Sequence, residues 1–338
     1  MNCMKEKLTV LIPTYNCEDI IEDCLESIKD IADEILIVDS FSTDKTLDVI
    51  TRNTRNGAQK TRTGATDFGG KVKIIQRKYG YSASQKNWAI PQAKNNWILL
   101  IDSDERLTPR LRSEIKSILK KQSILKKVSG FEIARRHYFL GKWLRFGGRY
   151  PLYNVRLFKK TCRYEDRNVH AHILLPKHEM RKLKNDIIHE SDRNLEQILE
   201  KLNRYSTYQA RYMTKIVNRG IKVDWKEFFT NYLAFKAVVK DVWFFIPFSP
   251  LWRFLYMYCL QLGFLDGREG LLIAVLYGFE DFVSKNKYKK YRTNQHECRT
   301  DAHESRIRRH DLSLNPSPRL GLARQAIQEE GSYSAKLG

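Results

Sequence analysis

The sequence lacks the cysteine spacing that marks zinc sites and disulfide-rich folds. Its six cysteines are scattered along the chain, and no two of them form a Cys-x-x-Cys pair. This usage favours a reducing compartment. A signal peptide is also missing, because the opening apolar run of MNCMKEKLTVLIPTYN is short and ends at a proline without a small-residue cleavage site. We therefore expect a protein that stays in the cytoplasm.

Long apolar runs and acidic excess are absent as well. No stretch reaches the roughly 18 to 20 charge-free apolar residues that a membrane-spanning helix needs. Lys and Arg number 60 against 39 Asp and Glu, so the formal net charge is +21. This charge favours a polyanionic partner, which can be nucleic acid, an anionic membrane surface or a phosphate-bearing substrate. The basic residues form no recognisable nucleic-acid module, so we expect no specific nucleic acid.

Apolar runs alternate with helical patterns through the first part of the chain. The runs LTVLIPTYN, EILIVD, KVKIIQ and WILLID read as strands, and the segments between them carry helical periodicity or helix-start signals. Strands that alternate with helices predict a parallel, doubly wound α/β sheet. Strand-like runs return in GFEIARRHYF, YNVRLFKK and KNDIIH. We interpret these as the second half of the sheet.

Composition predicts where the domains end. Residues 53–70 are polar, basic and rich in Gly, Thr and Asn, which is typical of a mobile insertion. The sequence predicts an α/β domain over 1–190 and a helical, membrane-associated region over 191–291. Residues 292–338 mix charge with Ser, Pro and Gly, and they predict a disordered tail.

Acidic residues follow the buried strand in WILLIDSDER. The carboxyl ends of parallel strands are where ligands bind, so these acids fall at a candidate site. On an extended chain Asp102 and Asp104 point to the same side, and two like charges there favour a cation between them. Hard oxygen ligands suit Mg²⁺ or Mn²⁺. The alternative is a solvated loop, in which Glu105 and Arg106 are ordinary surface charges.

Four motifs in this order, VLIPTYN, ILIVDSFSTDKT, SASQKNWAI and WILLIDSDERLTP, resemble the inverting glycosyltransferases of family 2. The nearer likeness is to the branch that contains lipopolysaccharide-core β-1,4-glucosyltransferases, because GGRYPLYNVRLFKK is similar to a segment of that branch. The resemblance implies a GT-A fold, which is Rossmann-like with a mostly parallel central sheet, here with a C-terminal helical extension. It also implies a nucleotide-sugar donor and a divalent cation, Mg²⁺ or Mn²⁺.

The resemblance also assigns roles to particular residues. Asp104 would hold the cation against the diphosphate, Asp102 would face both ribose and metal, and His189 would be a third metal ligand. The residues that it places around the nucleotide are Pro13, Thr14, Tyr15, Asp39, Lys86, Asn87 and Asp102. The alternatives are structural: Pro13 and Tyr15 as turn and packing residues, Asp39 as a helix cap, Lys86 as a solvent-facing charge and His189 as a strand-end histidine.

The catalytic base is the open position in the resemblance. Inverting transfer needs a group that takes the proton of the acceptor hydroxyl. Members of the branch commonly carry Glu where this chain has Ala171, and an alanine cannot act as a base. The remaining candidates are Asp166, His170 and His172: Asp166 has the right chemistry, and His170 matches the family position. A histidine on a half-buried strand is more often a structural hydrogen-bonding residue.

We therefore expect a hexosyltransferase that acts on a lipopolysaccharide-core or other surface-polysaccharide acceptor at the inner face of the cell membrane. The segment VWFFIPFSPLWRFLYMY and the basic run KNKYKKY suit peripheral binding to anionic lipid, with a saccharide or lipid-linked acceptor. One alternative is a protein that keeps the fold, has lost catalysis and binds membrane or nucleic acid through its charge. Another is a sugar nucleotidyltransferase, although IPTYNCED lacks the glycine-rich phosphate loop of that class.

Overall fold

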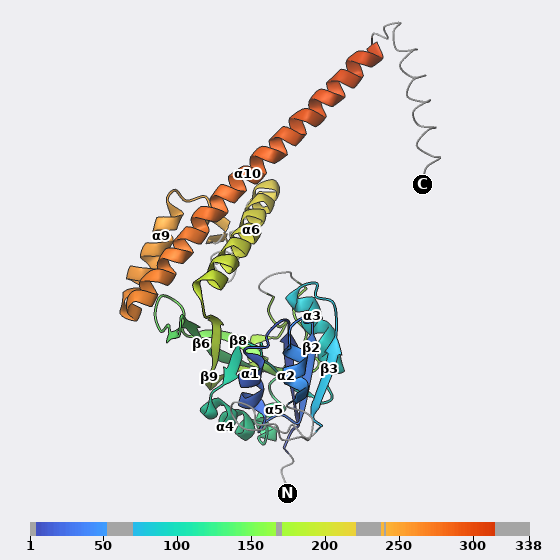
Figure 1. Ribbon diagram of the computed structural model, residues 1–338, viewed down its shortest axis with the longest axis vertical. Helices are drawn as coiled ribbons and strands as arrows, with labels where there is room; N and C mark the ends of the chain where they lie inside the picture. Colours follow the sequence, from blue (N-terminus) through green and yellow to red (C-terminus); the bar gives the residue numbers. More distant parts are fainter. Residues whose placement is uncertain (1–4, 53–69, 167–170, 221–237, 240, 315–338) are drawn as a thin grey trace, which may run out of the picture. The chain divides into compact units, whose positions relative to one another are not determined.

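The computed structural model describes residues 5–52, 70–166, 171–220, 238–239 and 241–314 (Figure 1). The predicted insertion lies outside these residues except for its last position, and so does the final part of the predicted tail. The chain divides into two compact units. The first comprises Met1–Lys201 and Leu251–Gly278, and the second comprises Leu202–Pro250 and Phe279–Gly338.

Nine strands of the described residues form one sheet in the first unit, in the order β3-β2-β1-β4-β8-β6-β9-β5, with β7 beside β6. The strands are β1 (Leu8–Thr14), β2 (Glu34–Asp39), β3 (Val72–Gln76), β4 (Trp97–Leu100), β5 (Glu105–Leu107), β6 (Gly130–Phe139), β7 (Lys142–Trp143), β8 (Leu152–Lys159) and β9 (Met180–Asp192).

The first four strands of this order are parallel, as the sequence predicts. β2 and β4 are buried along their whole length, because helices cover both faces of the sheet. In the register of β1 with β2, Thr14 lies opposite Asp39. β4 pairs with β1 on the other side and ends at Leu100, so the chain that follows it emerges at the same edge. One edge of the sheet therefore receives the segments after β1, β2 and β4.

Apolar side chains of the helices pack on the two faces of the sheet. The helix α1 buries Ile21, Cys24, Leu25 and Ile28 on one face, which matches the predicted helical stripe. The opposite face is covered from Ala83 to Ala93. The helices around the sheet are α1 (Ile21–Ile28), α2 (Thr46–Arg52), α3 (Ser82–Ala89), η1 (Ile90–Gln92), α4 (Pro109–Ile118), α5 (Gln122–Leu125) and η2 (Lys177–Glu179).

Beyond β4 the sheet becomes mixed. β8 runs antiparallel to both β4 and β6, whereas β9 runs parallel to β6 and antiparallel to β5. The three strands predicted from GFEIARRHYF, YNVRLFKK and KNDIIH are present as β6, β8 and β9. These strands bring residues from three separate parts of the sequence behind the segment that follows β4.

Helices follow the sheet, as predicted. Those within the described residues are α6 (Leu195–Arg219), α9 (Ser249–Leu255), the π-helical turn η3 (Tyr256–Leu260), η4 (Gly263–Asp266) and α10 (Gly267–Leu314). Among the described residues, no helix is both long and apolar enough to cross a membrane. α10 continues through residues 292–314, where the sequence predicts disorder. Neither Gly nor Pro interrupts this stretch, and the first proline comes directly afterwards, at Pro316.

The first unit includes a helical segment that lies far from the sheet in sequence. Asp266 accepts hydrogen bonds from the backbone N–H groups of Arg145 and Phe146, at 3.0 and 2.8 Å. Ile273 packs in one apolar cluster with Phe139. These contacts explain why residues 251–278 join the sheet, although the sequence predicts a domain boundary at 190. The fold is thus of the expected α/β class with a helical extension.

Candidate functional site

Asp39 ends β2 at the edge of the sheet and is fully buried. Its carboxylate accepts hydrogen bonds from the Thr14 hydroxyl at 3.1 Å, the Ser42 N–H at 3.0 Å and the Gln76 amide at 3.0 Å. Burial alone would raise the pKa of Asp39, but hydrogen bonds from Ser42, Gln76 and Thr14 outweigh it and hold the pKa below its ordinary value. The carboxylate is therefore ionised and already well supplied with donors.

The predicted residues Pro13 and Thr14 end β1, and Tyr15 begins the loop that follows it. Pro13 is half-buried and Thr14 is buried against Asp39, whereas the ring of Tyr15 is 62% exposed. The next residue, Asn16, ties this loop to the one after β2, because its N–H donates to the Ser42 hydroxyl at 3.0 Å. Tyr15 thus offers an open aromatic face at this edge of the sheet.

Asp102 follows β4 and contacts two cationic side chains. Its carboxylate lies 2.7 Å from the Arg156 guanidinium and 3.7 Å from Lys86 Nζ. Burial alone would raise the pKa of Asp102, but the charges of Arg156 and Lys86 hold it well below its ordinary range. The structure thus brings Lys86 to Asp102 as part of one charged cluster, rather than leaving it in solvent.

Arg156 and Glu105 both contact Asp102. Neither was predicted from the sequence to take part in the site. Arg156 lies on β8 and is 4% exposed, and Glu105 on β5 is fully buried, so Glu105 is not a surface charge. The Arg156 guanidinium lies 2.5 Å from the Glu105 carboxylate, to which Arg135 also donates at 3.3 Å. Glu105 in turn accepts the Asp102 N–H at 3.0 Å. The only available signal was Arg156 in the motif YNVRLFKK.

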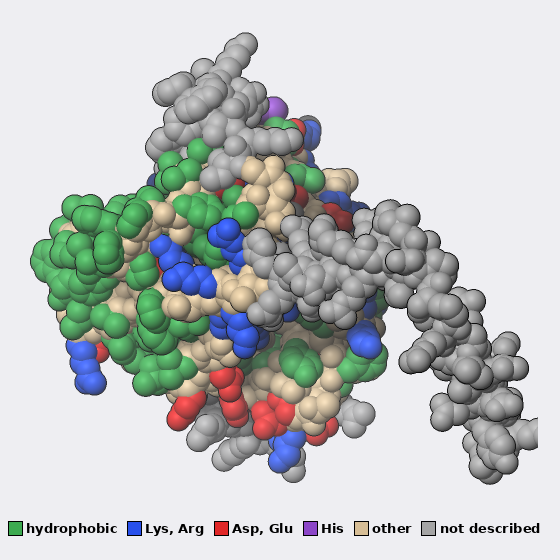
Figure 2. Space-filling model, turned by 90° about the horizontal axis from the view of Figure 1, so that it is seen from above, with side chains coloured by type: hydrophobic (Ala, Val, Ile, Leu, Met, Phe, Trp, Pro, Cys, Tyr) green, Lys and Arg blue, Asp and Glu red, His purple; other side chains and the backbone are tan. Residues whose placement is uncertain are grey.

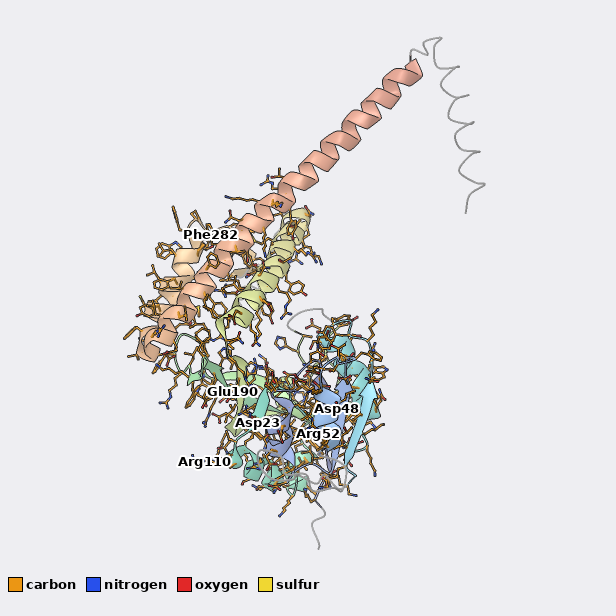
Figure 3. All side chains as sticks on the ribbon, in the orientation of Figure 1. Asp23, Asp48, Arg52, Arg110, Glu190 and Phe282 are labelled. Atoms are coloured by element: carbon orange, nitrogen blue, oxygen red, sulfur yellow. The ribbon has the colours of Figure 1, made fainter. Side chains whose placement is uncertain are left out.

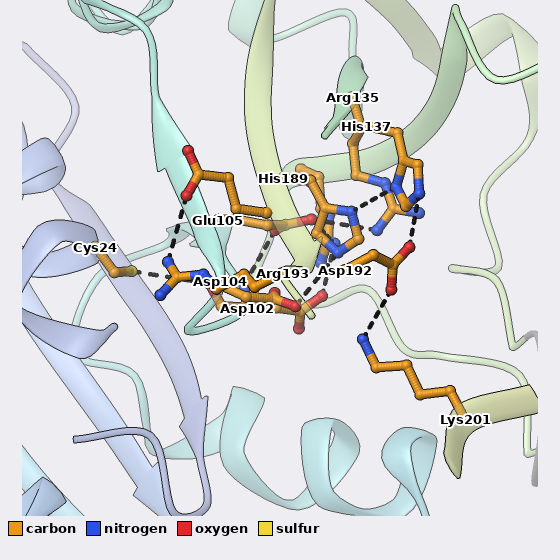
Figure 4. Close-up of polar contacts among 12 residues, drawn as sticks. Cys24, Asp102, Asp104, Glu105, Arg135, His137, His189, Asp192, Arg193 and Lys201 are labelled. Carbon is orange, nitrogen blue, oxygen red and sulfur yellow. Dashed lines mark hydrogen bonds and ion pairs between the residues drawn. The ribbon is translucent and has the colours of Figure 1, made fainter. Parts of the chain in front are cut away.

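Asp104 faces a different partner from Asp102 (Figure 4). The Glu105 N–H donates to the Asp102 carbonyl at 2.9 Å, so the chain turns between β4 and β5. The chain between Asp102 and Asp104 is therefore not the extended strand that the sequence interpretation assumed. Asp104 Oδ2 lies 3.4 Å from His189 Nε2. The two side chains are 27% and 13% exposed, so both are partly shielded from water.

A second histidine backs His189 on the neighbouring strand. His137 on β6 and His189 on β9 are paired in the sheet register, and their Nδ1 atoms lie 3.3 Å apart. Burial lowers the pKa of His137 to about 4, although Asp192 opposes the shift. His137 is therefore neutral near pH 7. No feature of the sequence singled out His137 or Asp192.

The other predicted residues make contacts of their own or lie outside the described residues. Asn87 binds the backbone of Tyr164 on both sides, with distances of 2.9 and 2.7 Å, which is a structural contact. Asp166 accepts a hydrogen bond from the hydroxyl of Tyr81. His172 has an exposed side chain. His170 lies outside the described residues.

The Asp104 and His189 pair fits a divalent cation. Within the described ranges no group of three or more His, Cys, Asp and Glu side chains is arranged around a common point. Two protein ligands nevertheless suffice for Mg²⁺, which usually keeps waters and substrate phosphates as its other ligands. Neighbouring ligands of an octahedral Mg²⁺ lie about 3 Å apart, close to the 3.4 Å between Asp104 Oδ2 and His189 Nε2. Asp102 is already held by two cationic side chains.

Arg106 forms two ion pairs next to this region. It lies 2.8 Å from Asp23 on α1 and 3.1 Å from Glu190 on β9, so it links a helix with the last strand. Figure 3 shows Asp23 and Glu190 as neighbours on the side of the sheet where α1 lies. Arg106 is therefore a structural link, and Asp104 comes two residues before it.

The class of the protein follows from two observations: the parallel sheet places ionised aspartates at one edge, and the chain matches known relatives. It is a glycosyltransferase. Residues 9–170 match the model of glycosyl transferase family 2, so the chain carries a domain of that family. This confirms the resemblance found in the motifs, and with the topology above it confirms the expected GT-A class of fold.

Two curated relatives cover most of the chain. An uncharacterized glycosyltransferase of Rickettsia typhi is 26% identical over 300 residues, which cover 84% of this chain and 87% of the relative. The lipopolysaccharide core biosynthesis glycosyltransferase LpsC of Rhizobium meliloti is 27% identical over 274 residues, or 80% of this chain and 90% of the relative. Among solved structures, the mannosyltransferase PcManGT of Pyrobaculum calidifontis is 14% identical with a TM-score of 0.47, covering 84% of this chain and 87% of that chain.

Proposed function

We propose that the protein is an inverting hexosyltransferase that moves a sugar from a nucleotide-sugar donor to a lipopolysaccharide-core or other surface-polysaccharide acceptor. The similarity to LpsC over 80% of the chain supports the acceptor class. The observation that carries the chemistry is the Asp104 and His189 pair, 3.4 Å apart beside the ionised Asp102. This pair offers a metal-binding position where the strands of a nucleotide-binding sheet end.

The donor would bind along the edge after β1, β2 and β4. Tyr15 supplies an exposed ring for the base, and Asp39 with its hydrogen-bonded loop shapes the nucleoside side. Asp102, oriented by Arg156 and Lys86, would accept a hydrogen bond from a ribose hydroxyl. Asp104 and His189 would hold Mg²⁺ or Mn²⁺, which when bound stabilises the negative charge of the departing nucleoside diphosphate.

The base that activates the acceptor is proposed among Asp166, His170 and His172. Asp166 is the carboxylate of the set, and it accepts a hydrogen bond from the Tyr81 hydroxyl. An ionised carboxylate can take the proton of the acceptor hydroxyl as that hydroxyl attacks the sugar on the face opposite the diphosphate.

Membrane association at the cytoplasmic face is the second part of the proposal. Several apolar side chains of 251–265 are largely exposed, and Figure 2 shows hydrophobic side chains gathered on the side where Figure 1 draws α9. We call this surface the apolar tip. Its members are Leu251, Trp252, Tyr256, Leu260, Phe264 and Leu265. Exposed apolar patches favour a lipid interface.

The Asp104→Ala variant tests the catalytic proposal. Transfer should fall by about 100-fold or more, and Mn²⁺-dependent nucleotide binding should be lost, because a metal ligand is gone. Asp30→Asn, which changes an exposed carboxylate on the surface, is the control and should retain activity. Full transfer by Asp104→Ala in excess EDTA would contradict the metal-dependent mechanism.

Product analysis with wild-type protein separates transfer from its enzymatic rival. Release of a nucleoside diphosphate supports glycosyl transfer, whereas release of pyrophosphate supports a sugar nucleotidyltransferase. The donor itself can be found by thermal shift with a panel of UDP- and GDP-hexoses, each with and without Mn²⁺. A ligand that binds the native state raises the melting temperature.

A further inference from the structure

A continuous row of side chains leads from Asp104 to Lys201 (Figure 4). His189 Nε2 lies 3.4 Å from Asp104, and His189 Nδ1 lies 3.3 Å from His137 Nδ1. On its other side, His137 Nε2 lies 2.9 Å from Asp192 Oδ2. The second oxygen of Asp192, Oδ1, accepts a hydrogen bond from Lys201 at 3.0 Å. Every residue of the row belongs to the first unit.

The pairing of two strands creates this row. β6 and β9 run parallel, and their register places His137 directly beside His189. Asp192 ends β9, opposite Phe139 in the same register. Lys201 reaches Asp192 from α6. The side chains of His137, His189 and Asp192 are 9%, 13% and 15% exposed, so solvent contributes little to where their protons reside.

The protons of the row can be assigned from the contacts. A neutral imidazole has one N–H and one lone pair, and between the two Nδ1 atoms one must donate and the other accept. If His137 carries its proton on Nε2, the Asp192 carboxylate, 2.9 Å from that nitrogen, favours the proton there electrostatically. Its Nδ1 then accepts from His189 Nδ1–H, which leaves a lone pair on His189 Nε2.

The opposite assignment is less favourable. It would set the lone pair of His137 Nε2 against the Asp192 carboxylate at 2.9 Å, in the more buried of the two contacts. Two acceptors at that distance repel, and little water is present to relieve them. In the favoured assignment the facing acceptors are His189 Nε2 and Asp104 Oδ2, 3.4 Å apart, where a cation can be shared.

We propose that Asp192 and His137 are positioning residues that fix the tautomer of His189, so that its Nε2 lone pair is turned to a divalent cation held with Asp104. The proposal rests on the function proposed above and adds two residues that act through His189 rather than on substrate. Metal-binding histidines commonly have their second nitrogen fixed in this way by a neighbouring acceptor, and loss of that partner typically costs 10- to 100-fold in metal affinity.

The Asp192→Asn variant should reverse the donor and acceptor roles along the row without changing its shape. Lys201 donates to Oδ1, so it should orient the new amide with its NH₂ group toward His137 Nε2. His137 would then accept there and donate from Nδ1, and His189 would carry its proton on Nε2, facing Asp104. A metal ion would have to displace that proton. Glu190→Gln, on the same strand but paired with Arg106, makes the same chemical change outside the row.

The first measurement is the tautomer itself, from ¹⁵N side-chain NMR of the metal-free protein at pH 7.5. We expect His189 protonated on Nδ1 in the wild type and in Glu190→Gln, and on Nε2 in Asp192→Asn. His189 protonated on Nε2 in the wild type would overturn the proposal. This readout needs neither metal nor activity.

The second measurement is Mn²⁺ affinity by calorimetry on the same three proteins. Asp192→Asn should bind 10- to 100-fold more weakly than wild type at unchanged melting temperature, and Glu190→Gln should match wild type. Equal affinity in Asp192→Asn would overturn the role of the row. A wild type that binds no Mn²⁺ would contradict the proposed cation site as well, and release of nucleoside diphosphate then still decides separately whether the protein is a transferase.

Discussion

Two aspartates at one edge of the sheet are kept ionised by different means. Asp39 is surrounded by hydroxyl, amide and backbone donors, whereas Asp102 is balanced by the charges of Arg156 and Lys86. Neutral donors supply direction without long-range charge, and cationic partners supply charge. Under the proposed function, hydrogen bonds would order the nucleoside side of the site, and alternating charges would order the diphosphate side.

Asp39→Asn should show how much those donors contribute, and the effect should depend on pH. The folded pKa of Asp39 lies below its unfolded value of about 4, so the stabilisation is present above pH 4 and is lost as pH falls through the folded pKa. We expect Asp39→Asn to be less stable than wild type by about 1–3 kcal/mol at pH 7. The difference in the free energy of unfolding between the two proteins should be smaller at pH 3. Urea unfolding at both pH values measures it, and a gap that does not change with pH would contradict the assignment.

At the scale of elements, the antiparallel insertion of β8 beside β4 shapes the site. It places Arg156 behind Asp102, and β5 then returns Glu105 to the same guanidinium. Each of these charges would be costly to bury alone. Their burial together holds the turn after β4 in one conformation.

Removal of Arg156 should therefore destabilise the folded protein strongly. Arg156→Leu leaves Glu105 buried with only Arg135 as a cationic partner, and we expect a loss of about 3–5 kcal/mol in the free energy of unfolding. The matched control is Arg112→Leu, which breaks a surface pair with Asp30 at 3.5 Å and should cost about 1 kcal/mol or less. Denaturant unfolding compares the two, and similar losses would show that the buried network contributes no special stability.

The same elements mark what sequence could and could not predict. β1, β2 and β4 are apolar runs that end in polar residues, so both the strands and Asp39, Asp102 and Asp104 could be located from the sequence alone. The partners of these acids depend on which strands become neighbours. Nothing local in YNVRLFKK indicates that β8 lies against β4, and the pairing of His137 with His189 follows from a register that joins residues 52 positions apart.

The whole molecule combines an enzyme site with an exposed apolar surface. The tip is carried by 251–265, whereas the basic run lies beyond residue 284. Lys285 and Lys287 are bound to groups of their own unit, to the Ile246 carbonyl at 2.8 Å and the Ser206 hydroxyl at 2.9 Å. Lys289 and Lys290 are exposed. Of the predicted lysines, these two are therefore the candidates for lipid headgroups.

Vesicle binding tests the membrane proposal. Wild-type protein should co-sediment with vesicles containing phosphatidylserine at low salt, and binding should weaken as salt rises. Serine at Trp252, Tyr256 and Leu260, which are 52%, 47% and 76% exposed, should abolish it. Phe254, which belongs to the predicted membrane segment, is half-buried, and its ring centroid lies 5.4 Å from that of Tyr258, so its replacement would also disturb packing.

The control is Tyr79→Ser, which removes a 57% exposed aromatic ring outside the tip and should bind as wild type. Protein that ignores anionic vesicles at low salt would contradict the membrane proposal. The acceptor would then be sought among soluble saccharides.

The distribution of thiols offers a direct way to follow the tip. Cys17, Cys24 and Cys162 are buried, and burial raises the pKa of each, so they should resist alkylation in the folded protein. Cys259 is exposed, between Tyr256 and Leu260. After Cys3 and Cys298 are changed to Ser, a maleimide dye that responds to solvent polarity should attach at Cys259 alone. Its emission would then report when the tip enters a bilayer, without any change to the residues of the sheet edge.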